Sequence, residues 1–325
     1  MPPPPNPDEV GTAATALASL TDAIATVLLG KTETIRLAVT ALVAQGHLLI
    51  EDVPGVGKTT LARAMAAAVT GQWRRIQFTP DLLPSDVSGV TIYHQASGTF
   101  EFHPGPVFAN IVIADEINRA SPKTQSALLE VMEERFVTVD GVRHPVPRPF
   151  LVVATQNPVE MDGTYRLPEA QLDRFLMKLS IGYPDEAAEL EVMRGDAERS
   201  PERIEPVLDT AAVARLAELA RRVDVHDEIY GYIRRIAVAS RRHPDIRVGL
   251  SPRACVALAR GARAHALGTG RGYVLPEDVK SLAPTVCAHR LLITPDAALR
   301  GQTGADVMAG IVAEVAAPHP VSAAR

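Results

Sequence analysis

Two segments of the 325-residue chain carry side chains whose types and spacing suit phosphate and metal chemistry. The first, EDVPGVGKTT (51–60), directly follows the apolar run 47–50, and the second, NIVIADE (110–116), is an apolar run that ends in two carboxylates. Glycines permit a backbone path in which successive N–H groups face inward, and such a path forms an anion cradle at a helix N-terminus. Together the two segments predict a site for a nucleoside triphosphate and a divalent metal ion.

The turn between residues 55 and 60 is the predicted phosphate-binding element. Lys58 is expected to reach the β- and γ-phosphates of ATP, and Thr59 is expected to place its hydroxyl on Mg²⁺. The predicted nucleotide-binding residues of this turn are Gly55, Val56, Gly57, Lys58, Thr59 and Thr60. The pattern G-x-x-x-x-G-K-[ST] is matched except at its first glycine, where the chain has Asp52. A surface turn with a chance Gly-Lys-Thr is the alternative for this segment taken by itself.

Asp115 and Glu116 end the second segment in the arrangement of a Walker B motif. Asp115, at the strand end, is predicted to hold Mg²⁺ through water, and Glu116 to orient and deprotonate the attacking water. The next apolar run, 150–155, leads into Gln156 and Asn157, and Asn157 is the candidate to position that water. A solvated turn is the alternative for each of these pairs alone. Two motifs in order, each after its own strand, favour the nucleotide site.

Hydrophobic patterning predicts the elements that position these residues. Short apolar runs without polar alternation are separated by helical stretches, at 47–50, 75–78, 110–115 and 150–155. Such runs are typical of strands buried on both faces, which predicts an α/β fold with a parallel sheet flanked by helices. Two hairpins are predicted as insertions, one within 89–108 with Ser97-Gly98 at its tip and one over 136–146 with Asp140-Gly141 at its turn.

Alanine-rich amphipathic helices replace the strand pattern beyond about residue 185, as in 210–223 and 251–267. We place the domain boundary between 185 and 205. The prediction is a disordered proline-rich tail, an α/β nucleotide-binding domain with the hairpin inserts, and a smaller all-α lid domain, over residues 1–10, 11–190 and 200–325.

Composition narrows the class of protein. A hydrophobic fraction of 46% is typical of a globular chain. No apolar run approaches the roughly 18 residues of a membrane span, and the first residues lack the pattern of a signal peptide. We therefore expect a cytoplasmic protein without a membrane span. A formal net charge of -5 disfavours general nucleic-acid binding, because neutralising phosphates supplies most of that affinity.

Cysteine and histidine spacing gives no metal motif. Cys255 and Cys287 lack metal-ligand spacing and lie in helical patterns, so they are predicted to be buried free thiols. His94, His103 and His144 lie near the two hairpins but lack the close paired spacing of a metal site. We expect ordinary surface histidines there.

Five segments together resemble the MoxR family of AAA+ ATPases: GHLLIEDVPGVGKTTLARAMA, FTPDLLPSDVSG, GPVFANIVIADEINRASPKTQSALLEVMEER, VVATQNPVE and LPEAQLDRFLMKL. The resemblance covers about residues 25–320. It implies a P-loop AAA+ core with a five-stranded parallel sheet, a helical lid, ATP and Mg²⁺ as cofactors, and a ring, usually hexameric, with nucleotide at the subunit interfaces. Phosphate loops of AAA+ proteins vary at their first position, so Asp52 is compatible with the family.

The resemblance implies two functional arginines. Arg174, in PEAQLDRF, occupies the position resembling the arginine finger, which enters the neighbouring subunit's site and stabilises charge on the γ-phosphate. Arg166 is the competing finger, and pairing of Arg174 with Glu169 or Asp173 on its own helix is the alternative role. Arg253, in GLSPRACVALA, matches the sensor 2 position.

Arg253 is expected in the first turn of a lid helix, because Ser251 has the properties of an N-cap and Pro252 those of a first helical residue. From the sensor 2 position an arginine touches the γ-phosphate and couples lid closure to the nucleotide state, whereas a solvated arginine is the alternative. Gly30 and Lys31, in VLLGKTETI, resemble the segment that lies against adenine in this family.

The function implied by the resemblance is chaperone-like. Mg·ATP hydrolysis in a ring would drive remodelling or maturation of partner proteins, with a von Willebrand factor A domain protein and a client enzyme as partners, and with metal-cofactor insertion as one form of that work. The 89–108 insert would face the partner or the ring pore, or would pack within the subunit.

Two other functions stay open. One is a nucleotide-gated scaffold, in which ATP holds an assembly together. The other is a DNA motor, since MCM helicases and magnesium chelatase ATPase subunits carry related inserts. The 136–146 hairpin offers only Arg143 and His144 for phosphate contact, so a nucleic-acid partner is not expected.

Overall fold

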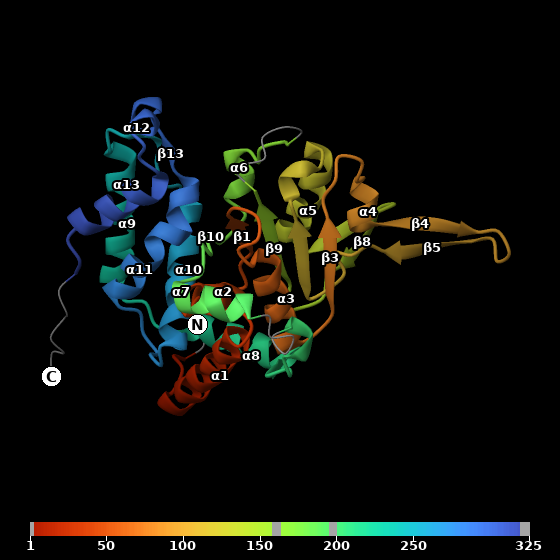
Figure 1. Cartoon of the computed structure of the whole chain (residues 1–325), viewed down its shortest axis with the longest axis horizontal. Coiled ribbons are helices and arrows are strands. Elements are labelled where there is room, and N and C mark those ends of the chain that lie inside the picture. Colours follow the sequence, from red (N-terminus) through yellow and green to blue (C-terminus); the bar gives the residue numbers. More distant parts are fainter. Residues whose placement is uncertain (1–2, 158–163, 195–199, 319–325) are drawn as a thin grey trace.

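The computed structural model describes residues 3–157, 164–194 and 200–318, and its centre is a five-stranded parallel sheet (Figure 1). The strand order is β10-β1-β9-β6-β3. These strands are β1 (Leu48–Glu51), β3 (Trp73–Gln77), β6 (Ile111–Asp115), β9 (Leu151–Gln156) and β10 (Met177–Leu179). The α/β fold with a parallel sheet is therefore confirmed, and the four apolar runs mark four of its strands to within two residues. The fifth, β10, has three residues and was not among those runs.

The inner strands of the sheet are buried on both faces, whereas the edge strand β3 is mostly exposed, contrary to the expectation for the run 75–78. Every residue of β6 and β9 is buried, which explains why these strands lack polar alternation. Alternate residues face opposite sides. Ile111 and Ile113 join a core shared with α1 (Pro7–Ala25), α2 (Thr32–Val43), α3 (Lys58–Ala68) and the C-terminal helices. Val112 and Ala114 join a second core with α5 (Pro122–Glu134) and α4 (Pro84–Ser88).

The C-terminal third is mainly helical, as expected for a lid. Its helices are α7 (Glu186–Met193), α8 (Thr210–Arg222), α9 (Asp227–Arg242), α10 (Pro252–Gly268), α11 (Pro276–Cys287), α12 (Pro295–Leu299) and α13 (Gly304–Glu314). It also contains a small antiparallel pair, β12 (Ile246–Val248) with β13 (Leu292–Ile293), which the all-α prediction missed. Short elements complete the chain: β2 (Val69–Thr70) paired with β11 (Leu208–Asp209), α6 (Glu169–Leu172), η1 (Ile117–Arg119), η2 (Pro201–Arg203) and η3 (Ala288–Arg290).

The first helix begins earlier than the sequence suggested. Helix α1 starts at Pro7, because the Asn6 side chain accepts the Glu9 N–H at 2.8 Å while the Asn6 N–H donates to the Glu9 carboxylate at 2.8 Å. Arg222 of α8 donates to both oxygens of Glu9, at 3.0 and 3.1 Å. The tail predicted over residues 1–10 is thus shortened by this capping box. Helices α1 and α2 pack against α8 and α10, so the core is continuous between the sheet and the lid helices.

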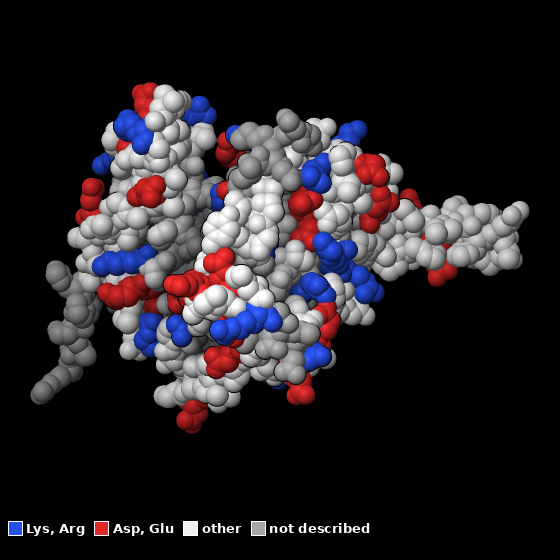
Figure 2. Space-filling view, viewed as in Figure 1, with Lys and Arg blue, Asp and Glu red and all other residues white. Residues whose placement is uncertain are grey.

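Both predicted hairpins are present. Strands β7 (Phe136–Val139) and β8 (Val142–Pro145) flank Asp140-Gly141, and both turn residues have positive φ. Strands β4 (Gly89–His94) and β5 (Thr99–Pro104) form the second hairpin, which projects from the body of the molecule in Figure 1. Figure 2 shows this hairpin without blue surface, in agreement with its lack of Lys and Arg.

None of the helices in the described part of the chain is long and apolar enough to cross a membrane. Cys255 and Cys287 are both free thiols. Cys287 is buried as predicted, whereas Cys255 is only partly buried. Burial raises the pKa of the Cys287 thiol to about 12, so this side chain packs as a neutral apolar group.

A buried ionic cluster stabilises the lid helices. Asp278 is 1% exposed and accepts hydrogen bonds from Arg271 at 2.6 and 2.7 Å and from the Leu275 N–H at 2.7 Å, with His265 Nδ1 at 2.7 Å. Burial by itself raises the pKa of the Asp278 carboxyl, but hydrogen bonds from Arg271 and His265 outweigh it and bring the pKa to about 2. Because the folded pKa is depressed, this stabilisation is present above the unfolded value near 3.9 and is lost as pH falls toward 2.

We predict that Asp278→Asn lowers the free energy of unfolding at pH 7 by about 3–5 kcal/mol, since it leaves the partly buried Arg271 without its ionised partner. The difference from the wild type should shrink below pH 4. Denaturant unfolding at several pH values checks both statements. The control is Asp227→Asn at an exposed position in the first turn of α9, where the expected loss is under about 1 kcal/mol. Equal losses for the two variants would contradict this account.

Candidate active site

The turn between β1 and α3 has the backbone path of a phosphate-binding loop. Gly55 and Gly57 have φ angles of +85° and +94°, in the left-handed region that favours glycine. Gly57 is the N-cap of α3, and a Cβ atom there would lie 2.9 Å from the Leu28 side chain. Conformation and close approach therefore both require glycine at position 57. The first N–H groups of a helix lack partners within it, so this N-terminus can receive an anion.

Lys58 opens α3 and is oriented toward the carboxyl ends of two strands. Its ammonium donates to the Gln156 carbonyl at 2.9 Å and to the Asp52 carbonyl. Gln156 is the last residue of β9 and Asp52 directly follows β1, so the positive charge lies at the edge of the sheet where the turn passes. Such a position suits contact with the terminal phosphates of a bound nucleotide.

Asp115 is buried at the end of β6 and accepts hydrogen bonds from hydroxyl groups on two other elements. Its Oδ1 accepts hydrogen bonds from Thr59 at 3.3 Å and from Thr155 at 3.1 Å, and its Oδ2 accepts one from Arg75 Nε at 2.6 Å. The predicted pair of metal-binding residues, Thr59 and Asp115, is thus brought together. A hydroxyl and a carboxylate are the hard oxygen donors that Mg²⁺ prefers, so these residues fit that ion.

Glu116 follows Asp115 in a strained conformation. Its φ and ψ are +55° and +49°, which costs on the order of 1–3 kcal/mol for a residue with a side chain. The Glu116 N–H donates to Thr155 Oγ1 at 3.0 Å, and its carboxylate is held by Gln77 at 2.9 Å and Arg119 at 3.4 Å. The strain re-aims the carboxylate away from the buried path of β6. Asn157, the predicted water-positioning residue, is buried directly after β9.

Asp52 has a structural role that the sequence pattern did not suggest. Its Oδ2 accepts hydrogen bonds from Ser180 Oγ at 2.7 Å, the Ile181 N–H at 2.8 Å and the Gly182 N–H at 2.7 Å. Burial alone raises the pKa of the Asp52 carboxyl, but the Gly182 and Ser180 hydrogen bonds outweigh it, so the pKa lies below its usual value. The residue that replaces the first glycine therefore anchors the connection from β10 to α7 onto the phosphate loop.

The Gly30 segment lies beside that connection. Lys31 Nζ donates to the Tyr183 carbonyl at 2.6 Å, and a Cβ atom at Gly30 would lie 3.1 Å from Asp185 Oδ2. Leu28, two residues earlier, contacts the phosphate loop at Gly57. The loop between α1 and α2 and the start of α7 thus lie beside the phosphate loop, and contact of Gly30 with adenine stays a prediction.

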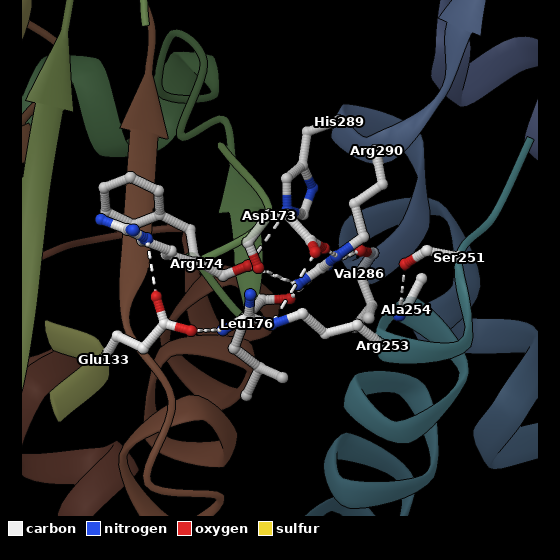
Figure 3. Close-up of polar contacts among 11 residues, drawn as sticks. Glu133, Asp173, Arg174, Leu176, Ser251, Arg253, Ala254, Val286, His289 and Arg290 are labelled. Carbon is white, nitrogen blue, oxygen red and sulfur yellow. Dashed lines mark hydrogen bonds and ion pairs between the residues drawn. The ribbon is translucent and has the colours of Figure 1, made fainter. Parts of the chain in front are cut away.

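A second group of charged side chains surrounds a cavity of about 270 Å³ before the first residues of β1 and β10. Glu133 bridges two arginines there: its Oε2 lies 3.0 Å from Arg174 Nε and its Oε1 lies 2.6 Å from Arg253 (Figure 3). Arg290, only 4% exposed, binds Asp173 at 2.6 Å. Arg174 therefore pairs with Glu133 on α5 instead of with Glu169 or Asp173.

Positive charge is in excess around this cavity. Its lining includes five arginines and two carboxylates: Arg135, Arg174, Arg253, Arg260, Arg290, Glu133 and Asp173. Burial and the neighbouring Arg260 charge lower the pKa of the Arg135 guanidinium to about 10. Crowding of like charges is unfavourable, so an anion from outside the subunit would be stabilised here.

The phosphate loop and the arginine cavity lie at opposite edges of the sheet. The carboxyl ends of the parallel strands carry the phosphate loop, Asp115 and Glu116. The other edge carries Arg174, which precedes β10, and Arg253, which pairs with Glu133 and Asp173. A six-residue strand such as β9 spans about 20 Å. Arg253, expected at the γ-phosphate from the sensor 2 resemblance, pairs with Glu133 and Asp173 and so lies at the edge of the sheet opposite the phosphate loop of its own subunit. Arg166 is exposed, in a segment where the Tyr165 N–H donates to the Asn118 carbonyl near the loop edge.

Known proteins are similar to this chain in sequence and in fold. Residues 47–177 match the ATPase family associated with various cellular activities (AAA), and residues 238–311 match the AAA lid domain. The crystal structure of a protein from Cytophaga hutchinsonii described as an ATPase superposes with a TM-score of 0.88 at 37% identity, covering 95% of this chain and 97% of that one. The fold and the site define an AAA ATPase, an enzyme that hydrolyses ATP.

Relatives specify the family within that class. The chain is 43% identical over 280 residues to the chaperone MoxR1 of Mycobacterium tuberculosis (83% of this chain, 74% of the relative) and 32% identical over 324 residues to the protein MoxR of Methylorubrum extorquens (91% and 93%). It is also 49% identical over 300 residues to the uncharacterized protein YeaC of Bacillus subtilis (92% and 94%). The chain belongs to the MoxR family of AAA+ ATPases, which confirms the family resemblance of its motifs.

We predict that Asp52→Gly, which restores the glycine of the general phosphate-loop pattern, does not improve ATP binding. It should lower the free energy of unfolding by roughly 2–3 kcal/mol, because the donors on residues 180–182 lose an ionised acceptor. Nucleotide titration and denaturant unfolding measure the two effects. Asp52→Asn, which keeps the size and part of the hydrogen bonding, should show a smaller loss. A glycine variant with wild-type stability would refute the anchoring role.

Proposed function

We propose that the chain assembles into a ring, hexameric as in its family, and that its nucleotide sites are completed between subunits. The observation that carries this proposal is the position of Arg174 and Arg253 at the edge of the sheet opposite their own phosphate loop. An arginine finger contributes by stabilising charge on the transferred phosphoryl group, so it must lie within contact of it. Only a neighbouring subunit's site offers that contact.

In this proposal each site uses residues from two subunits. Lys58 and the N–H groups of residues 55–60 bind the phosphates, and Thr59 and Asp115 hold Mg²⁺, which neutralises phosphate charge when bound. Glu116 accepts the proton of the attacking water, and Asn157 orients that water. Arg174 and Arg253 come from the adjacent subunit. There they exchange their ion pairs with Glu133 for contacts with the γ-phosphate, which carries more negative charge than a carboxylate. Hydrolysis then depends on assembly.

The work performed is proposed to be remodelling or maturation of a partner protein. Relatives named as a chaperone and as MoxR support this role, and a von Willebrand factor A domain protein, a client enzyme and metal-cofactor insertion are the family's implied partners and task. A DNA motor is less well supported. Arg143 lies over the Phe136 ring at 4.7 Å, and His144 stacks on Phe102 at 4.0 Å, so both side chains of that hairpin suited to phosphate are engaged by aromatic rings.

We predict that Arg174→Ala lowers the ATP turnover of the assembled protein by about 10³-fold or more while changing nucleotide affinity by less than about twofold. The reason is that its charge acts on a neighbour's transition state and not on binding within its own subunit. Steady-state turnover and nucleotide titration measure the two quantities. Arg166→Ala is the matched control and should retain turnover. Equal loss of affinity and turnover in Arg174→Ala, or loss of turnover only in Arg166→Ala, would reject the assignment.

We predict that Glu116→Gln binds ATP but turns it over about 10²–10⁴-fold more slowly, and so retains partner proteins that the wild type releases. Affinity capture from native lysate with ATP measures this, with Lys58→Ala as the variant that cannot bind nucleotide productively. A von Willebrand factor A domain protein or an enzyme precursor held only by Glu116→Gln supports remodelling. Recovery of nucleic acid and replication proteins, or the same set with both variants, would reject it. Partner-stimulated turnover of the wild type would exclude the scaffold alternative.

A further inference from the structure

The projecting β4–β5 hairpin brings together three side chains that the sequence spacing had separated. Its register pairs Val90 with His103, Ile92 with Glu101, and His94 with Thr99. Since alternate strand residues share a face, His94, Glu101 and His103 all lie on one face of the hairpin. One ligand atom from each of the three lies within 4.8 Å of the other two.

The contacts within this cluster are those of ligands facing a common point. His94 Nε2 lies 3.0 Å from Glu101 Oε2, and the His94 and His103 rings have centroids 5.8 Å apart. His94 Nε2 is shielded from solvent, yet among the described residues it makes no hydrogen bond of good geometry. A shielded ring nitrogen without a hydrogen bond, beside a carboxylate and a second imidazole, can coordinate a cation in the tautomer that leaves its lone pair free.

The opposite face of the hairpin fixes its position on the molecule. Phe102 stacks on His144 at 4.0 Å and meets Phe108 edge-on at 5.5 Å, while Tyr93 and Phe100 lie 5.0 Å apart. The contact between Phe102 and His144 holds this part of the aromatic face against the β7–β8 hairpin, and the face with His94 and His103 is left open. His144, the third histidine of this region, is thereby excluded from the cluster.

We propose that His94, Glu101 and His103 bind a divalent transition-metal ion of the Zn²⁺ class, outside the nucleotide site. Two imidazoles and a carboxylate suit Zn²⁺, Co²⁺ or Ni²⁺, whereas Mg²⁺ prefers a shell of oxygen atoms. Metal–ligand bonds of about 2.0–2.2 Å in tetrahedral geometry separate the ligand atoms by roughly 3.3–3.6 Å. The cluster therefore needs to contract by about 1 Å, which side chains this exposed can do by small rotations. Three protein ligands leave a fourth position open.

The ion would tie the two strands of the hairpin together. His94 ends β4, and the other two ligands lie on β5, so coordination links the strands next to the turn. Among residues 89–104, Glu101 is the one acidic side chain and neither Lys nor Arg occurs, so repulsion from neighbouring cations on the hairpin would be small. This site is independent of the proposed ring and of ATP.

The first test is calorimetric titration of the full-length protein with Zn²⁺ in the presence of saturating Mg²⁺. We expect one Zn²⁺ per chain to be lost, or bound at least about tenfold more weakly, in His94→Ala, His103→Ala and Glu101→Gln. His144→Ala is the matched control, because this histidine lies on the other face, and it should bind as the wild type does. A wild type that binds no Zn²⁺ at micromolar concentration, or a His144→Ala variant that loses as much affinity, would overturn the proposal.

Hydrogen exchange distinguishes a metal site from a loss of hairpin structure. Without Zn²⁺, the amides of β4 and β5 should exchange at the same rates in His94→Ala and the wild type. With Zn²⁺, they should be slowed in the wild type only. Slowing at any other part of the chain, with the hairpin unchanged, would place the ion elsewhere and reject the site.

Discussion

The whole arrangement depends on the five strands of the sheet being parallel. In a parallel sheet all carboxyl ends lie at one edge and all amino ends at the other, and both faces must be covered by helices. The phosphate loop, Asp115, Glu116 and Asn157 come together because each lies at, or directly after, the carboxyl end of a strand. The same rule sends Arg174, which precedes a strand, to the far edge. In the proposed ring, each subunit would contribute the phosphate loop to one nucleotide site and Arg174 to the next.

Each edge contains polar groups that are costly to hold. At the carboxyl edge, Glu116 has a left-handed backbone and Asp115 is buried, and Thr155 offsets both costs by donating to Asp115 and accepting from the Glu116 N–H. At the amino edge, arginines outnumber carboxylates, and Glu133 forms ion pairs with both Arg174 and Arg253. Buried or crowded charge of this kind is poorly explained by stability, since neutral packing would do as well. It is better explained by interaction with nucleotide.

The parts of the site that could be predicted from the sequence are those formed by residues adjacent in the chain. GVGKT and the Asp-Glu pair each form one local element, so their chemistry follows from residue type and spacing. Thr155, Arg75 and the Asp52 anchor depend on contacts across 40 to 130 positions, and no local pattern contains them. His94 and His103 are nine positions apart, and only the hairpin register shows that they meet. By contrast, the start of α1 could have been predicted, because Asn6 and Glu9 have the spacing of a capping box. The adjacent prolines instead led to the prediction of a disordered tail.

Strand β10 gives the two edges a direct mechanical connection. Arg174 lies three positions before its first residue, and the donors to Asp52 begin at Ser180, directly after its last. A three-residue strand spans about 10 Å and is held rigidly by its ladder to β1. In the proposed ring, a displacement of Arg174 by a neighbouring subunit would be transmitted along this short strand to the phosphate loop. The conformations of successive sites around a ring would then be coupled through the backbone of β10, because Asp52 binds the residues that directly follow this strand.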